Sequence, residues 1–99
     1  MEFIVNIDQL DKKTKHVEKV LTFNGNKVLN LQLARGESIP VHDAPEHVMV
    51  IVRKGKVLFH VGEEQVELMS ENFIYLKPLE KHSLHALEDA HILVVQIKE

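Results

Sequence analysis

The stretch GESIPVHDAPEHVMVIVRKG, which runs from Gly36 to Gly55, contains the pattern that decides the fold. Residues 48–52 within it are apolar at every position and mostly β-branched, which is typical of a strand with both faces covered. A glycine stands at each end of the stretch, where the chain is expected to reverse direction. The stretch therefore predicts a buried strand that follows a proline-containing loop and precedes a turn.

The other apolar runs extend this pattern in both directions. Asn24-Gly25 separates two of them and predicts a hairpin, because a tight primed turn needs positive φ. Residues 8–19 fit either a short helical turn capped by Asp8 or a loop followed by a strand, and we favour the second. About eight or nine short strands predict an all-β antiparallel sandwich or barrel. Further strands are expected within residues 28–33, 57–61, 66–69, 73–76 and 92–97.

Length and composition bound the possible functions. A chain of 99 residues has the size of one domain, so we expect residues 1–99 to form a single one. Fifteen acidic against twelve basic residues give a net charge of −3, which argues against a nucleic-acid partner. The absence of cysteine excludes thiolate metal sites and fits a reducing compartment. The N-terminus lacks the order of a signal peptide and the longest apolar run is too short for a membrane span, so we expect a cytoplasmic protein with no membrane partner.

Two stretches of the chain each contain a histidine at a characteristic spacing from glycine or proline residues. In residues 36–55, Gly36 stands six residues before His42, and Gly55 closes the stretch. In residues 72–86, a predicted strand and a proline-containing loop lead to His82. The two stretches resemble, in degenerate form, the two sequence motifs of the cupin superfamily, and in particular its small single-domain bacterial members. The likeness covers about residues 17–97.

The resemblance implies a double-stranded β-helix, that is, a jelly-roll or cupin-type barrel that is often dimeric. It also implies an internal pocket in which three histidines and one glutamate usually hold a divalent transition metal. His42 and His82 occupy two of these four positions, whereas Ala44 stands at the second histidine position and Val48 at the glutamate position. The fold signal is therefore strong, and the functional signal is weaker because this fold supports many activities.

A site for iron, manganese, nickel or zinc needs at least three donors that meet at one point. His47 would restore a three-histidine set with His42 and His82 if it turned inward, and Glu46 is a possible further ligand. Strand alternation does not fix the direction of these side chains, because they follow Pro45 in a loop. The alternative is that His47 is a solvated loop residue.

Two hypotheses for function follow. The first is a metal-dependent cupin that binds a small molecule, with His42, His47 and His82 as ligands, and acts as a small oxygenase, isomerase or lyase; no catalytic residue is assigned. The second is a metal-free, non-catalytic ligand-binding or accessory cupin, which the missing glutamate favours. Both hypotheses predict a small-molecule ligand. The apolar last strand, residues 92–97, also favours a homodimer, because an apolar outer face needs cover.

Overall fold

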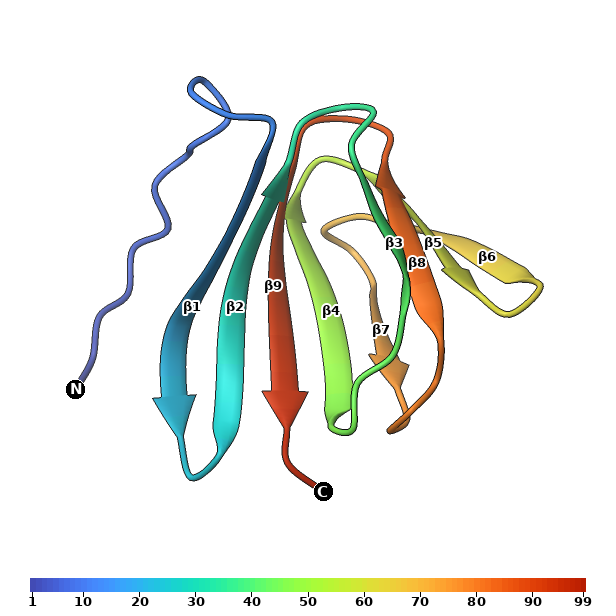
Figure 1. Cartoon of the computed structure of the whole chain (residues 1–99). Helices are drawn as coiled ribbons and strands as arrows, with labels where there is room; N and C mark the ends of the chain where they lie inside the picture. The colour runs from blue at the N-terminus through green and yellow to red at the C-terminus, as the bar shows by residue number, and fades with distance from the viewer.

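Nine antiparallel strands form two facing sheets in this computed structural model, which describes residues 1–99. The five-stranded sheet has the order β1-β2-β9-β4-β7, and the four-stranded sheet has the order β3-β8-β5-β6 (Figure 1). The chain crosses between the two sheets, as the predicted double-stranded β-helix requires. The strands are β1 (Lys15–Phe23), β2 (Asn26–Leu33), β3 (Ser38–His42), β4 (His47–Lys54), β5 (Val57–Val61), β6 (Glu64–Leu68), β7 (Phe73–Leu76), β8 (His82–Ala86) and β9 (Ala90–Ile97).

The turn between β1 and β2 confirms the predicted hairpin. Asn24 and Gly25 have φ values of 50° and 80°. Positive φ at both central residues is what the primed two-residue turn demands, and its twist matches that of the flanking strands. The expected loop-plus-strand arrangement before it is also confirmed, because the chain forms a turn near Leu10 and β1 begins only at Lys15.

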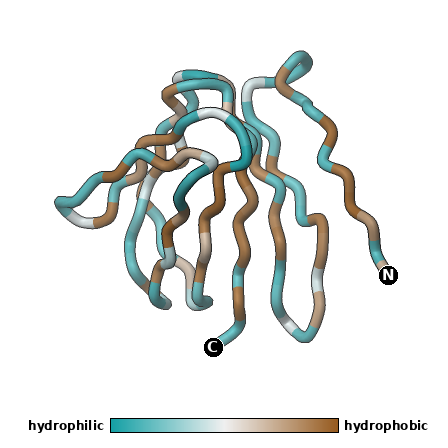
Figure 2. The backbone as a smooth tube through the Cα atoms, turned by 180° about the vertical axis from the view of Figure 1, so that it is seen from behind, coloured by the Kyte–Doolittle hydropathy of each residue, from teal (hydrophilic) through white to brown (hydrophobic).

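The hydrophobic core lies between the two sheets and follows the alternation of each strand. On β4, Val48, Val50 and Val52 are at most 3% exposed, whereas the intervening residues lie on the outer face. Phe59 on β5 is fully buried opposite them, in the four-stranded sheet. Figure 2 shows the same division along the chain, with hydrophobic residues concentrated in the strands and hydrophilic residues at the turns. The structure has no helix of the length and hydropathy needed to cross a membrane.

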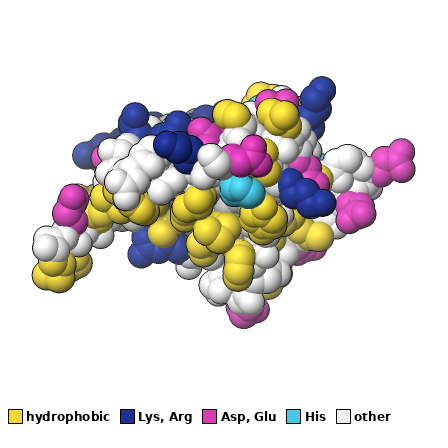
Figure 3. All heavy atoms as spheres, turned by 90° about the horizontal axis from the view of Figure 1, so that it is seen from below, with side chains coloured by type: hydrophobic (Ala, Val, Ile, Leu, Met, Phe, Trp, Pro, Cys, Tyr) yellow, Lys and Arg dark blue, Asp and Glu magenta, His cyan; other side chains and the backbone are white.

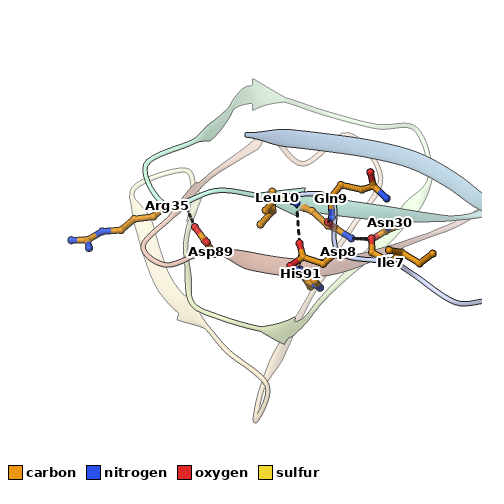
Figure 4. Close-up of polar contacts among 9 residues, drawn as sticks. Ile7, Asp8, Gln9, Leu10, Asn30, Arg35, Asp89 and His91 are labelled. Carbon is orange, nitrogen blue, oxygen red and sulfur yellow. Dashed lines mark hydrogen bonds and ion pairs between the residues drawn. The ribbon is translucent and has the colours of Figure 1, made fainter. Parts of the chain in front are cut away.

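The segment before β1 is held against the outer face of the five-stranded sheet by one buried amide. The Gln32 side chain on β2 is fully buried; its Oε1 accepts from the backbone N–H of Gln9 at 2.8 Å, and its Nε2 donates to the carbonyl of Ile7 at 3.0 Å. Between these two residues, Asp8 pairs with His91 of β9 at 3.3 Å (Figure 4). A hydrogen bond from the Leu10 N–H lowers the pKa of Asp8 below its ordinary value. The segment is therefore tied to β2 and β9 by side chains and not by a backbone ladder.

We expect Gln32→Ala to lower the free energy of unfolding by about 1–3 kcal/mol, because it removes two part-buried hydrogen bonds, each with a net value of roughly 0.5–1.5 kcal/mol. The segment before β1 should also become more sensitive to limited proteolysis. Urea unfolding and digestion followed by mass spectrometry measure the two effects. Gln9→Ala is the matched control, because the bond from Gln9 comes from its backbone and survives the substitution. Equal stability of Gln32→Ala and the wild type would contradict this account.

Candidate functional site

A cavity of about 200 Å³ lies between the sheets, at the end of the barrel where β3 ends and β8 begins. Nine of its twelve lining residues are hydrophobic, and its polar wall consists of His42, His82 and Gln96. The view onto this end of the molecule shows hydrophobic side chains gathered around a histidine (Figure 3). The cavity is therefore an apolar chamber with a few convergent polar groups, which is the usual form of a small-molecule site.

The two motif histidines meet at the wall of this cavity. His42 ends β3, His82 begins β8, and the two residues pair directly across these strands. Their ring centroids are 4.2 Å apart in an edge-to-face arrangement with an interplanar angle of 61°. The predicted convergence of the two imidazoles inside the barrel is thus present in the structure.

The backbone fixes which nitrogen of each ring is available. His42 Nδ1 lies 2.9 Å from the carbonyl oxygen of Pro40, and His82 Nδ1 lies 2.9 Å from the carbonyl oxygen of Glu80. A carbonyl oxygen only accepts, so each Nδ1 carries the hydrogen and donates it. In the neutral rings the lone pair is therefore on Nε2, which forms no hydrogen bond within the protein for either histidine.

His82 is embedded in the apolar wall, whereas His42 is exposed at the mouth. His82 is 6% exposed, and its ring stacks on Phe59 with ring centroids 5.6 Å apart and an interplanar angle of 12°. Burial lowers the pKa of His82 below the ordinary histidine value, and positive charge on His42 lowers it further. The Glu80 carbonyl and the carboxylates of Asp43 and Glu80 act in the opposite direction. His82 is therefore neutral at physiological pH and presents a lone pair.

All four positions at which the resemblance implies metal ligands face this one cavity. Ala44 and Val48 line it together with His42 and His82. Ala44 supplies a methyl group and Val48, which is 3% exposed, an apolar side chain, so two of the four donors are missing. Two imidazoles without a third donor do not fit the metal site of the three-histidine, one-glutamate type.

The structure does not bring His47 or Glu46 to the pair. His47 begins β4 next to the inward-facing Val48, so alternation places its side chain on the outer face. There its Nδ1 lies 2.6 Å from the Tyr75 hydroxyl, and the two rings stack with centroids 5.8 Å apart. The Glu46 carboxylate instead lies 3.6 Å from the Lys27 ammonium. No group of three or more histidine, aspartate or glutamate side chains is placed to hold a metal ion. Metal binding by His42, His47 and His82 stays a prediction.

Comparison with known families connects this geometry to other proteins. The family model described as the AraC-like ligand binding domain matches residues 28–97, which is most of the chain. The chain belongs to the AraC-like ligand-binding domain family. A search of curated proteins found no match. The matched range spans β2 to β9 and therefore every residue of the cavity except Val17 on β1.

Solved structures similar to this AraC-like domain confirm its cupin fold. An RmlC-like cupin protein from Desulfovibrio desulfuricans is 17% identical, with 98% of this chain and 94% of that chain covered and a TM-score of 0.82. A cupin superfamily protein from Desulfitobacterium hafniense is 10% identical over 97% and 84% of the two chains, with a TM-score of 0.81. An RmlC-like cupin with a double-stranded β-helix fold from Methanocaldococcus jannaschii is 24% identical over 99% and 92%, with a TM-score of 0.76. At these identities the likeness concerns the fold alone.

Two contributors to the site of this AraC-like domain were not predicted as such from the sequence. The sequence leaves Phe59 open as a residue of the core or of the pocket mouth and favours the core, and nothing local indicates that it stacks on His82. Gln96 is the polar residue in an inward-facing series with Ile92 and Val94, and it pairs with Val48 across β4. A polar residue at an inward position of an apolar strand is the signal that identifies it as a lining residue.

The depressed pKa of His82 makes the stability of this AraC-like domain depend on pH. The unfolded chain binds a proton at this residue near the ordinary histidine pKa of about 6.5, whereas the folded protein binds it only at lower pH. The contribution of neutral His82 to the free energy of unfolding is therefore fully present above about pH 6.5, and it is lost as the pH falls through the lower folded-state pKa. In urea titrations from pH 8 to pH 5, the wild type should lose more stability than His82→Gln. Parallel pH profiles of the two proteins would contradict this expectation.

Proposed function

We propose that this cupin binds a small molecule inside the barrel cavity, with His42 and His82 as its direct polar contacts. The observation that supports the proposal most is the meeting of two imidazoles, 4.2 Å apart, in a wall that is otherwise mostly hydrophobic. Both Nε2 atoms are left without a partner in the protein, so each is a polar atom in a mostly apolar wall that is free to bind a ligand. The family description, a ligand-binding domain, supports the same function.

The proposal is of binding without a resident metal, which is the second of the two hypotheses raised by the sequence. Its support is the donor set, because Ala44 and Val48 leave two imidazoles where the family pattern has four donors. Elemental analysis of protein purified without a metal-affinity step should accordingly find substoichiometric metal. Near-stoichiometric iron, manganese, nickel or zinc that is lost in His82→Ala would instead support the metal-dependent hypothesis.

Filling the cavity tests whether the ligand binds there. Ala44 lies in the loop between β3 and β4 with its side chain at the cavity wall, and its carbonyl accepts from the Leu79 N–H at 2.7 Å. Ala44→Leu leaves this backbone contact in place and occupies part of the chamber. Compounds that raise the melting temperature of the wild type in a fragment panel should lose their effect in Ala44→Leu. They should keep it in His85→Leu, since His85 bonds Ser38 on the outer face. Hits that survive Ala44→Leu would place the binding site elsewhere.

We further propose that the protein forms a homodimer through the outer face of the five-stranded sheet. Phe73 and Tyr75 of β7 are 62% and 50% exposed on this face, and they pair with Ile51 and Met49 of β4. An apolar band of this kind on a sheet favours burial against a second copy. Light scattering after gel filtration should give the dimer mass for the wild type and the monomer mass for Phe73→Asp. A monomeric wild type would overturn this assignment.

A further inference from the structure

The cavity offers hydrogen-bond acceptors to its contents, and no charged side chain lines it. Both Nδ1 atoms donate to backbone carbonyls, so the neutral rings of His42 and His82 can only accept a hydrogen bond at Nε2. No lysine, arginine, aspartate or glutamate is among the lining residues. The third polar group, the Gln96 amide, forms no hydrogen bond within the protein and is free to donate or accept. A ligand that satisfies this wall must bring a hydrogen of its own.

The size and apolarity of the cavity limit the rest of the ligand. Its volume of about 200 Å³ is below the range of roughly 300–1,000 Å³ found for drug-sized ligands. An apolar cavity of about 150 Å³ is known to hold benzene. The chamber therefore has room for a body of about one six-membered ring. Residues such as Leu29, Leu31 and Val50 surround that body with hydrocarbon, so an apolar ligand surface gains free energy when it is buried there.

We propose that the cavity selects a compact, uncharged molecule with an apolar, ring-sized body and one hydroxyl or amine group that donates a hydrogen bond to Nε2 of His42 or His82. This inference rests on the function proposed above and names the chemical class of its ligand. A hydroxyl fits best, because its oxygen can also accept a hydrogen bond from Gln96. Anions are disfavoured, because the wall has no cationic side chain to offset their loss of hydration.

Four monosubstituted benzenes with different substituent chemistry test the selection. Phenol carries the donor, anisole keeps the oxygen without its hydrogen, toluene has neither, and benzoate carries a negative charge. Isothermal titration at pH 7.5, with chelator-treated protein, measures the four dissociation constants; phenol is neutral at this pH because its pKa lies near 10, like that of tyrosine. Phenol should bind roughly 2- to 10-fold more tightly than toluene or anisole, the range expected for one net hydrogen bond. Benzoate should bind most weakly.

Two substitutions link the preference to the histidines. Leucine has no acceptor and is an apolar side chain of similar size, so the substitution of the histidine that accepts the hydrogen bond, His82→Leu or His42→Leu, should reduce the advantage of phenol over toluene while toluene still binds. If His82→Leu does not fold, a loss of the preference in His42→Leu assigns the contact to His42, which is exposed and tolerates substitution more readily. If His42→Leu keeps the preference, a nitrogen-15 shift of His82 Nε2 on addition of phenol assigns the contact to His82, and the absence of such a shift overturns the proposal. His85→Leu on the outer face is the matched control and should keep the full preference.

The possible outcomes separate this inference from the function on which it rests. Equal binding of phenol, anisole and toluene, all abolished by Ala44→Leu, overturns the donor requirement and leaves the cavity as a binding site. Preferred binding of benzoate overturns the exclusion of anions. A preference for phenol that appears only when metal is added overturns direct contact with the imidazoles. If none of the four binds, the ring-sized class is wrong, and the fragment panel with Ala44→Leu then decides the proposed function separately.

Discussion

Ala44→His combined with Val48→Glu is expected to turn the cavity into a tight site for a divalent transition metal. Both positions face the same chamber as His42 and His82, so the double substitution completes a set of three imidazoles and one carboxylate. The Nδ1 bonds to Pro40 and Glu80 already orient the two native rings with Nε2 free, as the hydrogen-bond partners behind metal-bound histidines do. The affinity for zinc or manganese should rise at least about 100-fold over the wild type. Removing only a hydrogen-bond partner of a metal ligand lowers metal affinity roughly 10- to 100-fold, and two whole ligands are gained here.

The stability of this double variant provides a second readout. Without metal it should be less stable than the wild type, because the new carboxylate replaces a side chain that is 3% exposed in the core. Saturating metal should reverse the loss, by about 2.7 kcal/mol at a concentration 100 times the dissociation constant. Calorimetric titration and thermal unfolding with and without metal measure the two effects.

Two triple variants control the location of this engineered site. Adding His82→Ala to the double variant should abolish the gain in metal affinity. Adding His47→Ala should leave it intact, since His47 contacts Tyr75 on the outer face. A loss of metal with His47→Ala would show that this residue reaches the cavity, and would support the predicted ligand set of His42, His47 and His82.

Gly55→Ala is expected to destabilise the protein far more than Gly36→Ala. The two glycines have similar positive φ values of 84° and 90°. A Cβ at Gly36 would meet nothing within 4 Å, whereas one at Gly55 would overlap the backbone carbonyl oxygen of Asp89 and touch Ala90. Gly36→Ala should therefore cost only the left-handed penalty of about 1–2 kcal/mol. Gly55→Ala should cost about 3 kcal/mol or more, because the chain between β8 and β9 must also move.

Urea unfolding of the two variants beside the wild type measures this difference directly. The pair is informative because both substitutions carry the cost of placing a Cβ on a residue with a similar positive φ. Gly55→Ala adds the cost of moving the Asp89 backbone away from the new Cβ. Equal losses of stability in the two variants would mean that the chain relaxes without cost at Gly55.

Much of the fold was predictable because its signals are local. Asn24-Gly25 specifies a turn through its own φ preferences, and the apolar residues 48–52 specify a strand. The expectation that both faces of this strand are covered holds for its inner face, whereas Met49 and Ile51 on the outer face are only half-buried. The convergence of His42 and His82 was also predictable, because the cupin motif spacing places them at the facing ends of two paired strands. These features depend on short stretches of sequence or on a pattern shared with many proteins.

The remaining features depend on contacts between distant segments. The direction of His47 follows from where β4 begins after the Pro45 loop, which the residues of the loop do not determine. Asp8 was considered as a helix cap, yet its carboxylate accepts from Leu10 in a tight turn and pairs with His91, 83 residues away. Which ring nitrogen of His82 carries the hydrogen likewise depends on the carbonyl of Glu80, which the β7–β8 loop positions. No periodicity in the sequence encodes such positions.

The two Nδ1 anchors also turn the imidazoles into spectroscopic reporters. A ring held at one nitrogen by a carbonyl cannot flip without losing that bond, so each histidine keeps one tautomer. The nitrogen-15 chemical shift of each Nε2 then reads the state of a single atom, with distinct values for a bare lone pair, an accepted hydrogen, an added proton and a coordinated ion. Selective isotope labelling of histidine would thus distinguish an empty barrel from one that holds a hydrogen-bond donor, an acid or a metal, whichever molecule carries that group.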